Sequence, residues 1–204
     1  MNGLRITRSP DGSPAFRSDS IGAGARGSGA TFVSVGRSDF ARYFAPLKPL
    51  FARWRWVLHA EGYIFRFPDA WYAEGGEGAA KLAEAERRVI EERDDWRLVE
   101  GPYLEAVADT LLDDWCDFFA LTGDVGLDAF TEGYWAAATP AAAHDFLTRH
   151  VALHFSCVDG AVWEVHAADE ALLEAVRAHL AGTRGVAVAE STLMRSLRRY
   201  EGHG

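Results

Sequence analysis

Apolar side chains recur at intervals of three and four residues along several stretches of the chain, and this spacing predicts amphipathic helices. The longest such pattern follows Gly101-Pro102, where it predicts one helix over residues 102–121. Proline, glycine or a capping Ser, Thr or Asp stands at the ends of most of the others. The remaining predicted helices cover residues 39–45, 79–93, 127–130, 140–149, 191–199 and the stretch between Asp169 and Gly182.

Other stretches alternate apolar with polar residues or are rich in aromatic and β-branched residues, which predicts strands. Two of them flank Asp159-Gly160, a dipeptide typical of hairpin turns, so residues 150–158 and 161–166 are expected to pair. The other expected strands are residues 4–7, 31–35 and 185–189, and a second hairpin made of 54–59 and 63–67. Because strands come as hairpins, the pattern predicts an α+β fold in which antiparallel hairpins pack against several helices.

The first 30 residues differ from the rest of the chain. They hold six glycines, several serines and prolines, and few large apolar side chains. We expect residues 1–30 to form a flexible or irregular Gly/Ser-rich arm and residues 31–204 to form a single domain. With 49% of its residues apolar, the chain can build a sizeable core.

Composition narrows the class of protein. No apolar run approaches the ~20 residues that span a bilayer, and residues 1–12 lack the apolar stretch of a signal peptide. The two cysteines, Cys116 and Cys157, agree with a reducing compartment. We therefore expect a cytoplasmic protein without membrane contact. Arginine far outnumbers lysine, and alanine and glycine are abundant, which indicates a GC-rich bacterial genome.

Charge is distributed unevenly along the chain. Residues 98–148 contain ten carboxylates and no lysine or arginine, so this segment carries −10 while the whole chain carries −9. A surface of one sign attracts metals or basic proteins and repels nucleic acid. On the predicted helix, four carboxylates spaced by four residues would form one stripe opposite the apolar face. They are Glu105, Asp109, Asp113 and Asp117.

The acidic stripe predicts a docking surface for a basic protein. In class and charge it resembles bacterial immunity and inhibitor proteins, which bind basic toxins through acidic surfaces that speed association. We expect a non-catalytic binding protein of immunity, antitoxin or inhibitor type, with no cofactor and no nucleic-acid partner. The expected partner-binding residues are Glu105, Asp109, Asp113, Asp114, Asp117, Asp124 and Asp128, and the candidate aromatic anchors are Tyr103, Trp115, Tyr134 and Trp135.

A metal-dependent enzyme is the alternative. The string Asp113-Asp114-Trp115-Cys116-Asp117 resembles the D-D-x-x-D motif of terpene synthases and prenyltransferases, in which the aspartates bind Mg²⁺ that holds a substrate diphosphate. The resemblance implies an enzyme that uses the carboxylate cluster Asp113, Asp114 and Asp117. It covers five residues, the second metal-binding motif of those families is missing, and the C-terminal hairpin does not suit their all-α fold.

A zinc site and a structural role complete the alternatives. His150, His154 and Cys157 are close in sequence, but on a strand Cys157 points to the face opposite the two histidines, which is a poor arrangement for zinc. The weak metal candidates are therefore Asp113, Asp117, His150 and His154. As a structural component of a larger assembly, the chain would order its N-terminal arm on contact with a neighbour.

Overall fold

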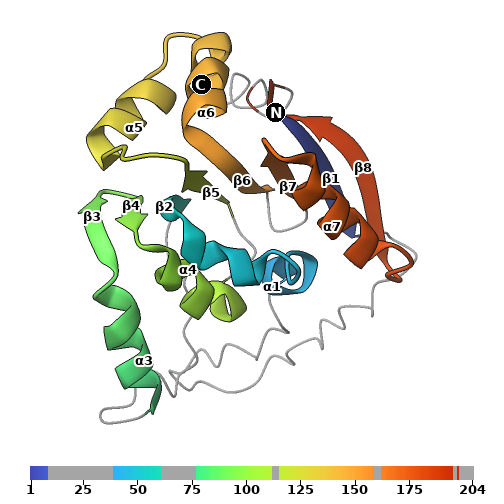
Figure 1. Ribbon diagram of the computed structural model, residues 1–204, viewed down its shortest axis with the longest axis horizontal. Coiled ribbons are helices and arrows are strands. Elements are labelled where there is room, and N and C mark those ends of the chain that lie inside the picture. Colours follow the sequence, from blue (N-terminus) through green and yellow to red (C-terminus); the bar gives the residue numbers. More distant parts are fainter. Residues whose placement is uncertain (9–38, 61–76, 112–114, 159–161, 195–196, 198–204) are drawn as a thin grey trace, which may run out of the picture.

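An antiparallel sheet of eight strands forms the centre of the molecule, in the order β3-β4-β2-β5-β6-β7-β1-β8 (Figure 1). The computed structural model describes residues 1–8, 39–60, 77–111, 115–158, 162–194 and 197, and the account below is confined to them. The strands are β1 (Asn2–Arg8), β2 (Arg55–Ala60), β3 (Val89–Arg93), β4 (Trp96–Val99), β5 (Cys116–Leu121), β6 (Val151–Val158), β7 (Val162–Ala167) and β8 (Val186–Thr192). The predicted α+β class is confirmed.

Helices cover both faces of this sheet. They are α1 (Asp39–Tyr43), α3 (Glu77–Glu86), α4 (Gly101–Val107), α5 (Leu127–Tyr134), α6 (Pro140–His150) and α7 (Glu170–Leu180), with 3₁₀ turns η1 (Lys48–Arg53) and η2 (Ala108–Thr110). Side chains of α1, η1, α4 and α7 pack on what we call the first face, and those of α5 and α6 on the second face. Along β5 the two faces alternate, because Phe118 joins the first core and Phe119 the second.

The C-terminal half follows the sequence pattern, except that residues 191 and 192, expected to begin a helix, end strand β8. Helix α6 begins where expected, since the Thr139 hydroxyl accepts a hydrogen bond from the Ala142 N–H at 3.2 Å. Helix α7 begins after Asp169, whose carboxylate accepts from the Ala171 N–H at 2.9 Å. Strands β6 and β7 pair as the predicted hairpin. None of the described helices is long and apolar enough to cross a bilayer.

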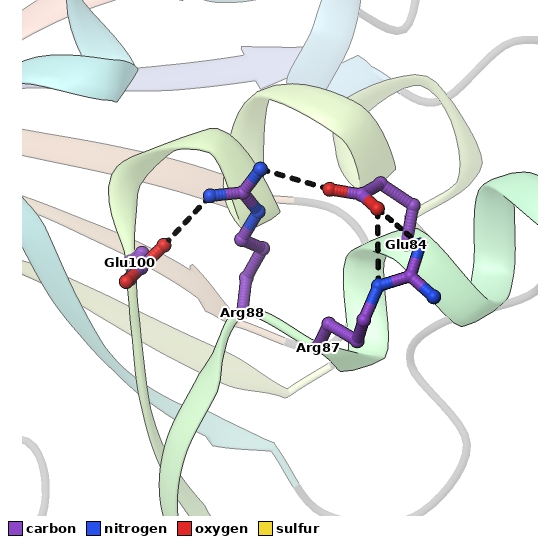
Figure 2. A network of polar contacts seen from close by, with 4 residues as sticks. All are labelled: Glu84, Arg87, Arg88 and Glu100. Atoms are coloured by element: carbon purple, nitrogen blue, oxygen red, sulfur yellow. Dashed lines mark hydrogen bonds and ion pairs between the residues drawn. The ribbon is translucent and has the colours of Figure 1, made fainter.

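The predicted helix over residues 79–93 is too long. Helix α3 ends at Glu86, and the chain then enters β3. The Arg88 guanidinium forms an ion pair with Glu84 at 2.8 Å and another with Glu100 at 3.0 Å, as Figure 2 shows. Hydrogen bonds from Arg87 and Arg88 lower the pKa of the Glu84 carboxyl. The shorter helix therefore ends in a set of ion pairs on its surface.

The N-terminus belongs to the sheet, contrary to the expected arm boundary at residue 30. Strand β1 lies between β7 and β8 and pairs with both, so residues 2–8 are an interior strand. The strand predicted at residues 4–7 is confirmed, and its apolar Leu4 and Ile6 are fully buried. The rest of the expected arm, and the strand predicted at residues 31–35, lie outside the described residues.

The strand predicted at residues 54–59 is confirmed as β2, but the predicted hairpin pairing with residues 63–67 is wrong. Strand β2 pairs with β4 along one edge and with β5 along the other. Both edges of β2 are therefore occupied by strands that come later in the chain. The second half of the predicted hairpin, residues 63–67, lies outside the described residues.

Candidate functional site

The long acidic helix predicted over residues 102–121 is wrong. Helix α4 ends at Val107, the turn η2 follows, and Cys116–Leu121 form strand β5. All six residues of β5 are buried, so the strand has apolar residues on both faces and no simple alternation. Periodicity alone does not distinguish such a strand from a buried helix. Glu105, Asp109 and Asp117 consequently do not share one stripe.

The structure separates the expected partner-binding carboxylates. Glu105 on α4 and Asp109 on η2 are exposed beside the first face, whereas Asp124 and Asp128 are exposed at α5, which covers the second face. Asp117 is buried in β5. Asp113 and Asp114 lie outside the described residues. One flat partner surface therefore cannot contain both described pairs of exposed carboxylates.

Cations from distant parts of the chain neutralise much of the acidic segment. Counting charge along the sequence missed them, because they come from the turn between α3 and β3, from η1, from β2 and from β3. The ion pairs are Glu100 with Arg88 at 3.0 Å, Asp109 with Lys48 at 2.6 Å, Asp124 with Arg55 at 2.7 Å, and Asp128 with Arg93. Among the segment's described carboxylates, Glu105 and Glu132 are exposed and have no ion pair with a described cation.

Helix α5 lies next to the β3–β4 hairpin (Figure 1), and both elements carry exposed carboxylates. The two elements are joined by the Arg93–Asp128 ion pair and by the Leu127 N–H, which donates to Glu91 at 3.1 Å. We call this surface the acidic edge and define it by Asp94, Asp95, Asp124, Asp128 and Glu132. Its five carboxylates and the two arginines paired with them, Arg55 and Arg93, leave a net charge of −3.

Trp135 stands at the end of the acidic edge. Its side chain is 57% exposed, whereas Tyr103 and Tyr134, two of the other candidate anchors, are buried. Its ring contacts those of His59 and Trp96, with centroid distances of 5.1 and 5.7 Å. Beside it lies a hollow of about 320 Å³, lined by Tyr134, Trp135, Ala137, Ala138, Thr139, Pro140, Ala143 and Leu197. Trp115, the remaining candidate anchor, is 36% exposed.

A second group of polar side chains is buried on the second face of the sheet. We call it the polar cluster; it consists of Asp117, His154, Ser156, Glu164 and His166, all nearly inaccessible to solvent. The register places Asp117, Ser156 and Glu164 in one row across β5, β6 and β7, and His154 opposite His166 in the next. Ser156 and Glu164 were not identified from the sequence, although polar residues at alternate positions of a hairpin are a signal for one polar face.

The centre of the polar cluster is a buried pair. His154 Nε2 lies 2.8 Å from Asp117 Oδ1, within hydrogen-bond distance. Burial raises the pKa of Asp117, but hydrogen bonds from His154 and Ser156 and the charges of His154 and His59 lower it by more, so the pKa falls below its ordinary value. Asp117 is thus held as a carboxylate inside the protein. The Nδ1 atom of His154 has no hydrogen-bond partner among the described residues.

Stacked aromatic and histidine rings extend the polar cluster across the sheet. His154 stacks between Phe119, at a centroid distance of 4.4 Å, and His166, at 5.5 Å. The ring of His166 lies over Gly3 of β1, where an added Cβ would be 2.2 Å from His166 Cδ2 and 2.6 Å from the Val165 carbonyl oxygen. Only glycine leaves room for this ring.

Substitution of Gly3 by alanine is expected to lower the free energy of unfolding by about 1–3 kcal/mol, because the buried His166 ring must shift. Gly123 offers a matched control, since a Cβ there would meet nothing within 4 Å, and Gly123→Ala should change stability by less than about 0.5 kcal/mol. Urea unfolding of the two variants measures the difference. Equal effects at the two positions would show that the close approach of His166 does not constrain β1.

Of the four metal candidates, the structure brings together Asp117 and His154, which form the buried pair of the polar cluster, whereas Asp113 lies outside the described residues. His150 ends helix α6, where its ring contacts Phe146 at a centroid distance of 4.8 Å, and it does not join His154. Cys157 lies opposite Cys116 on the first face, and both are free thiols. The expected parity is confirmed for Cys157 and His154, but His150 precedes strand β6 and does not take part in it. No group of three His, Cys, Asp or Glu side chains among the described residues could hold a metal ion.

No family model, no curated protein and no solved structure matches the chain.

Proposed function

We propose that this chain is a non-catalytic, cytoplasmic binding protein that presents its acidic edge to a basic protein partner. The observation that carries the proposal is the exposed face of α5. Asp128, Glu132 and Trp135 follow one another at intervals of four and three residues, so they lie in one line on the helix. Carboxylates beside an exposed aromatic ring supply both long-range attraction and a contact residue of the kind that dominates protein interfaces.

The internal ion pairs leave this edge available. The side chains of Asp124 and Asp128 are 96% and 81% exposed despite their arginine partners. Exposed ion pairs contribute roughly 0–1 kcal/mol, so a partner's cations can join or replace them at little cost. The net negative charge of the edge then favours encounter with a basic surface. Such a pairing fits a protein of immunity, antitoxin or inhibitor type whose partner is a basic toxin.

The proposal differs from the sequence-based hypothesis in its location. The expected surface centred on residues 105–117, but the exposed carboxylates that share a face with an exposed tryptophan belong to α5. Glu105 and Asp109 lie beside the other face of the sheet and serve as comparison positions rather than as part of the proposed surface.

Neutralising the acidic edge should weaken binding of the basic partner. The partner is captured from a lysate of the source organism, identified, and titrated against the full chain by calorimetry. The triple variant Asp124→Asn, Asp128→Asn and Glu132→Gln is expected to bind about tenfold more weakly, as three lost rim contacts of roughly 0.5 kcal/mol each would give. Binding by the unmodified chain should also weaken as salt is raised.

The matched control removes three exposed carboxylates around Arg177 instead, through Glu170→Gln, Glu174→Gln and Glu190→Gln. Both triple variants change the net charge equally. The control therefore distinguishes the effect of a local contact on binding from the effect of the protein's overall charge. The proposal predicts less than about a twofold effect for the control. Equal weakening by both variants, or a partner that is acidic and indifferent to salt, would contradict it.

A further inference from the structure

Trp135, whose exposed ring lines the hollow, stands three residues after the exposed Glu132 at one end of the acidic edge. The backbone N–H of Trp135 donates to the Thr131 carbonyl at 2.9 Å, so helical geometry continues through Trp135. Glu132 and Trp135 are therefore one turn apart on the same side of the helix, with Cβ atoms about 5–6 Å from each other. A group that contacts the indole ring can reach the carboxylate.

The tryptophan ring is positioned by its neighbours. His59 contacts it at 5.1 Å, Trp96 at 5.7 Å and Tyr134 at 6.5 Å between ring centroids. His59 is itself stacked on Trp96 at 4.2 Å, and Trp96 is buried. An exposed side chain supported in this way loses little conformational freedom when a partner binds, which favours its use as an anchor.

Most of the described side chains that line the hollow beside Trp135 are apolar. They include alanines, Pro140 and Leu197, and none of the described lining residues is charged. Its volume of about 320 Å³ lies at the small end of the range for ligand pockets. The carboxylate that stands closest along α5 is Glu132, which forms no ion pair with a described residue, unlike Asp124 and Asp128.

These features match the chemistry of one side chain. An arginine guanidinium is planar, stacks on aromatic rings and binds a carboxylate through two parallel N–H donors. The aliphatic stem of arginine covers apolar surface while its charged end stays at the rim. Lysine has no planar group to stack, and an apolar side chain would leave the Glu132 carboxylate without a cation.

We propose that the hollow receives an arginine side chain of the basic partner, with its guanidinium against the Trp135 ring and hydrogen-bonded to the Glu132 carboxylate. The inference rests on the proposed function for the identity of the partner, but the site can be tested without it. Glu132 supplies the charge, Trp135 supplies the stacking surface, and the apolar side chains that line the hollow accept the stem of the arginine.

Nuclear magnetic resonance of the full ¹⁵N-labelled chain tests the site with three blocked tripeptides, acetyl-Gly-X-Gly-amide, in which X is arginine, lysine or the uncharged analogue citrulline. The indole N–H signal of Trp135 is assigned by its loss in Trp135→Phe. The arginine peptide should shift this signal and bind at least about threefold more tightly than the other two, since it alone combines stacking with a charged bidentate contact. A signal that does not move, or equal binding of the three peptides, would overturn the inference.

Two variants identify the carboxylate. Glu132→Gln should weaken the arginine peptide by about threefold or more, whereas Glu105→Gln, an exposed carboxylate on the other side of the sheet, should leave it unchanged. Equal behaviour of the two variants would overturn the role of Glu132.

If binding of the whole partner depends on Asp124 and Asp128 but not on Glu132 or Trp135, the arginine site fails and the proposed function stands. If the peptide binds at Trp135 but no basic partner exists, the proposed function fails alone.

Discussion

Replacing Asp117 with alanine is expected to lower the free energy of unfolding at neutral pH by about 3–5 kcal/mol, because removing one partner of a buried pair strands the other. Asp117 is 4% exposed, and the hydrogen bond with His154 measures 2.8 Å. The variant leaves the Nε2 of His154 and the hydroxyl of Ser156 without their acceptor. Urea unfolding followed by circular dichroism measures the loss.

The pH dependence of this effect has a definite sign. The pKa of Asp117 in the folded protein is lower than its ordinary value of 3.8, so the folded state favours the carboxylate. The resulting stability is fully present above the unfolded pKa and is lost as pH falls through the lower folded pKa. The difference between the unmodified chain and Asp117→Ala should therefore be constant near neutrality and shrink below about pH 4.

Asp109→Ala is the matched control, since Asp109 forms an exposed ion pair with Lys48 and its loss should cost no more than about 1 kcal/mol. A loss for Asp117→Ala no larger than that of the control would show that the buried pair adds nothing. A difference that stayed constant down to pH 3 would instead show that the carboxylate charge of Asp117 is not what stabilises the fold.

Local signals explain which parts of the fold were predictable. Helices α6 and α7 each combine a periodic apolar face with a capping side chain, Thr139 or Asp169, and strands β6 and β7 flank a typical turn dipeptide. Strand β5 lacked any such signal, because Phe118 and Phe119 are both buried and the sequence reads as a continuous apolar run. The pairing partners of β2 could not be predicted from local sequence either, because β4 and β5 come from later in the chain.

The candidate site was harder to predict than the fold, because its charges and contacts are long-range. A carboxylate-rich segment without lysine or arginine predicted a strongly acidic surface, yet Arg55 and Arg93 from β2 and β3 reach Asp124 and Asp128. The polar cluster depends on register across β5, β6 and β7, which places Asp117 beside His154 although 37 residues separate them in the chain. Alternation of polar and apolar residues along one strand shows that the strand has a polar face, but it does not show which residues of other strands lie beside that face.

Phe155 gives the second large effect expected on stability, and it tests the other side of the strand that carries His154 and Ser156. Its fully buried ring lies at the centre of the first core, with centroid distances of 4.4 Å to Phe44, 5.1 Å to Phe40, 5.9 Å to Phe51 and 6.0 Å to Trp56. Phe155→Ala should lower the free energy of unfolding by about 3–5 kcal/mol, since the surrounding rings cannot all close the cavity.

Phe146→Ala provides the matched control for Phe155, because Phe146 on α6 is only partly buried and its principal ring contacts are Phe130 at 5.5 Å and His150 at 4.8 Å. Its loss should destabilise the fold by about half as much or less, as less apolar surface returns to water. Denaturant unfolding of the two variants measures both losses, and an equal loss would show that the buried ring of Phe155 contributes no more than the partly buried ring of Phe146. The two faces of β6 therefore stabilise the fold in different ways. Phe155 does so by packing, and His154 by a charged hydrogen bond with Asp117. Of these two contributions to the free energy of unfolding, only that of the hydrogen bond should depend on pH.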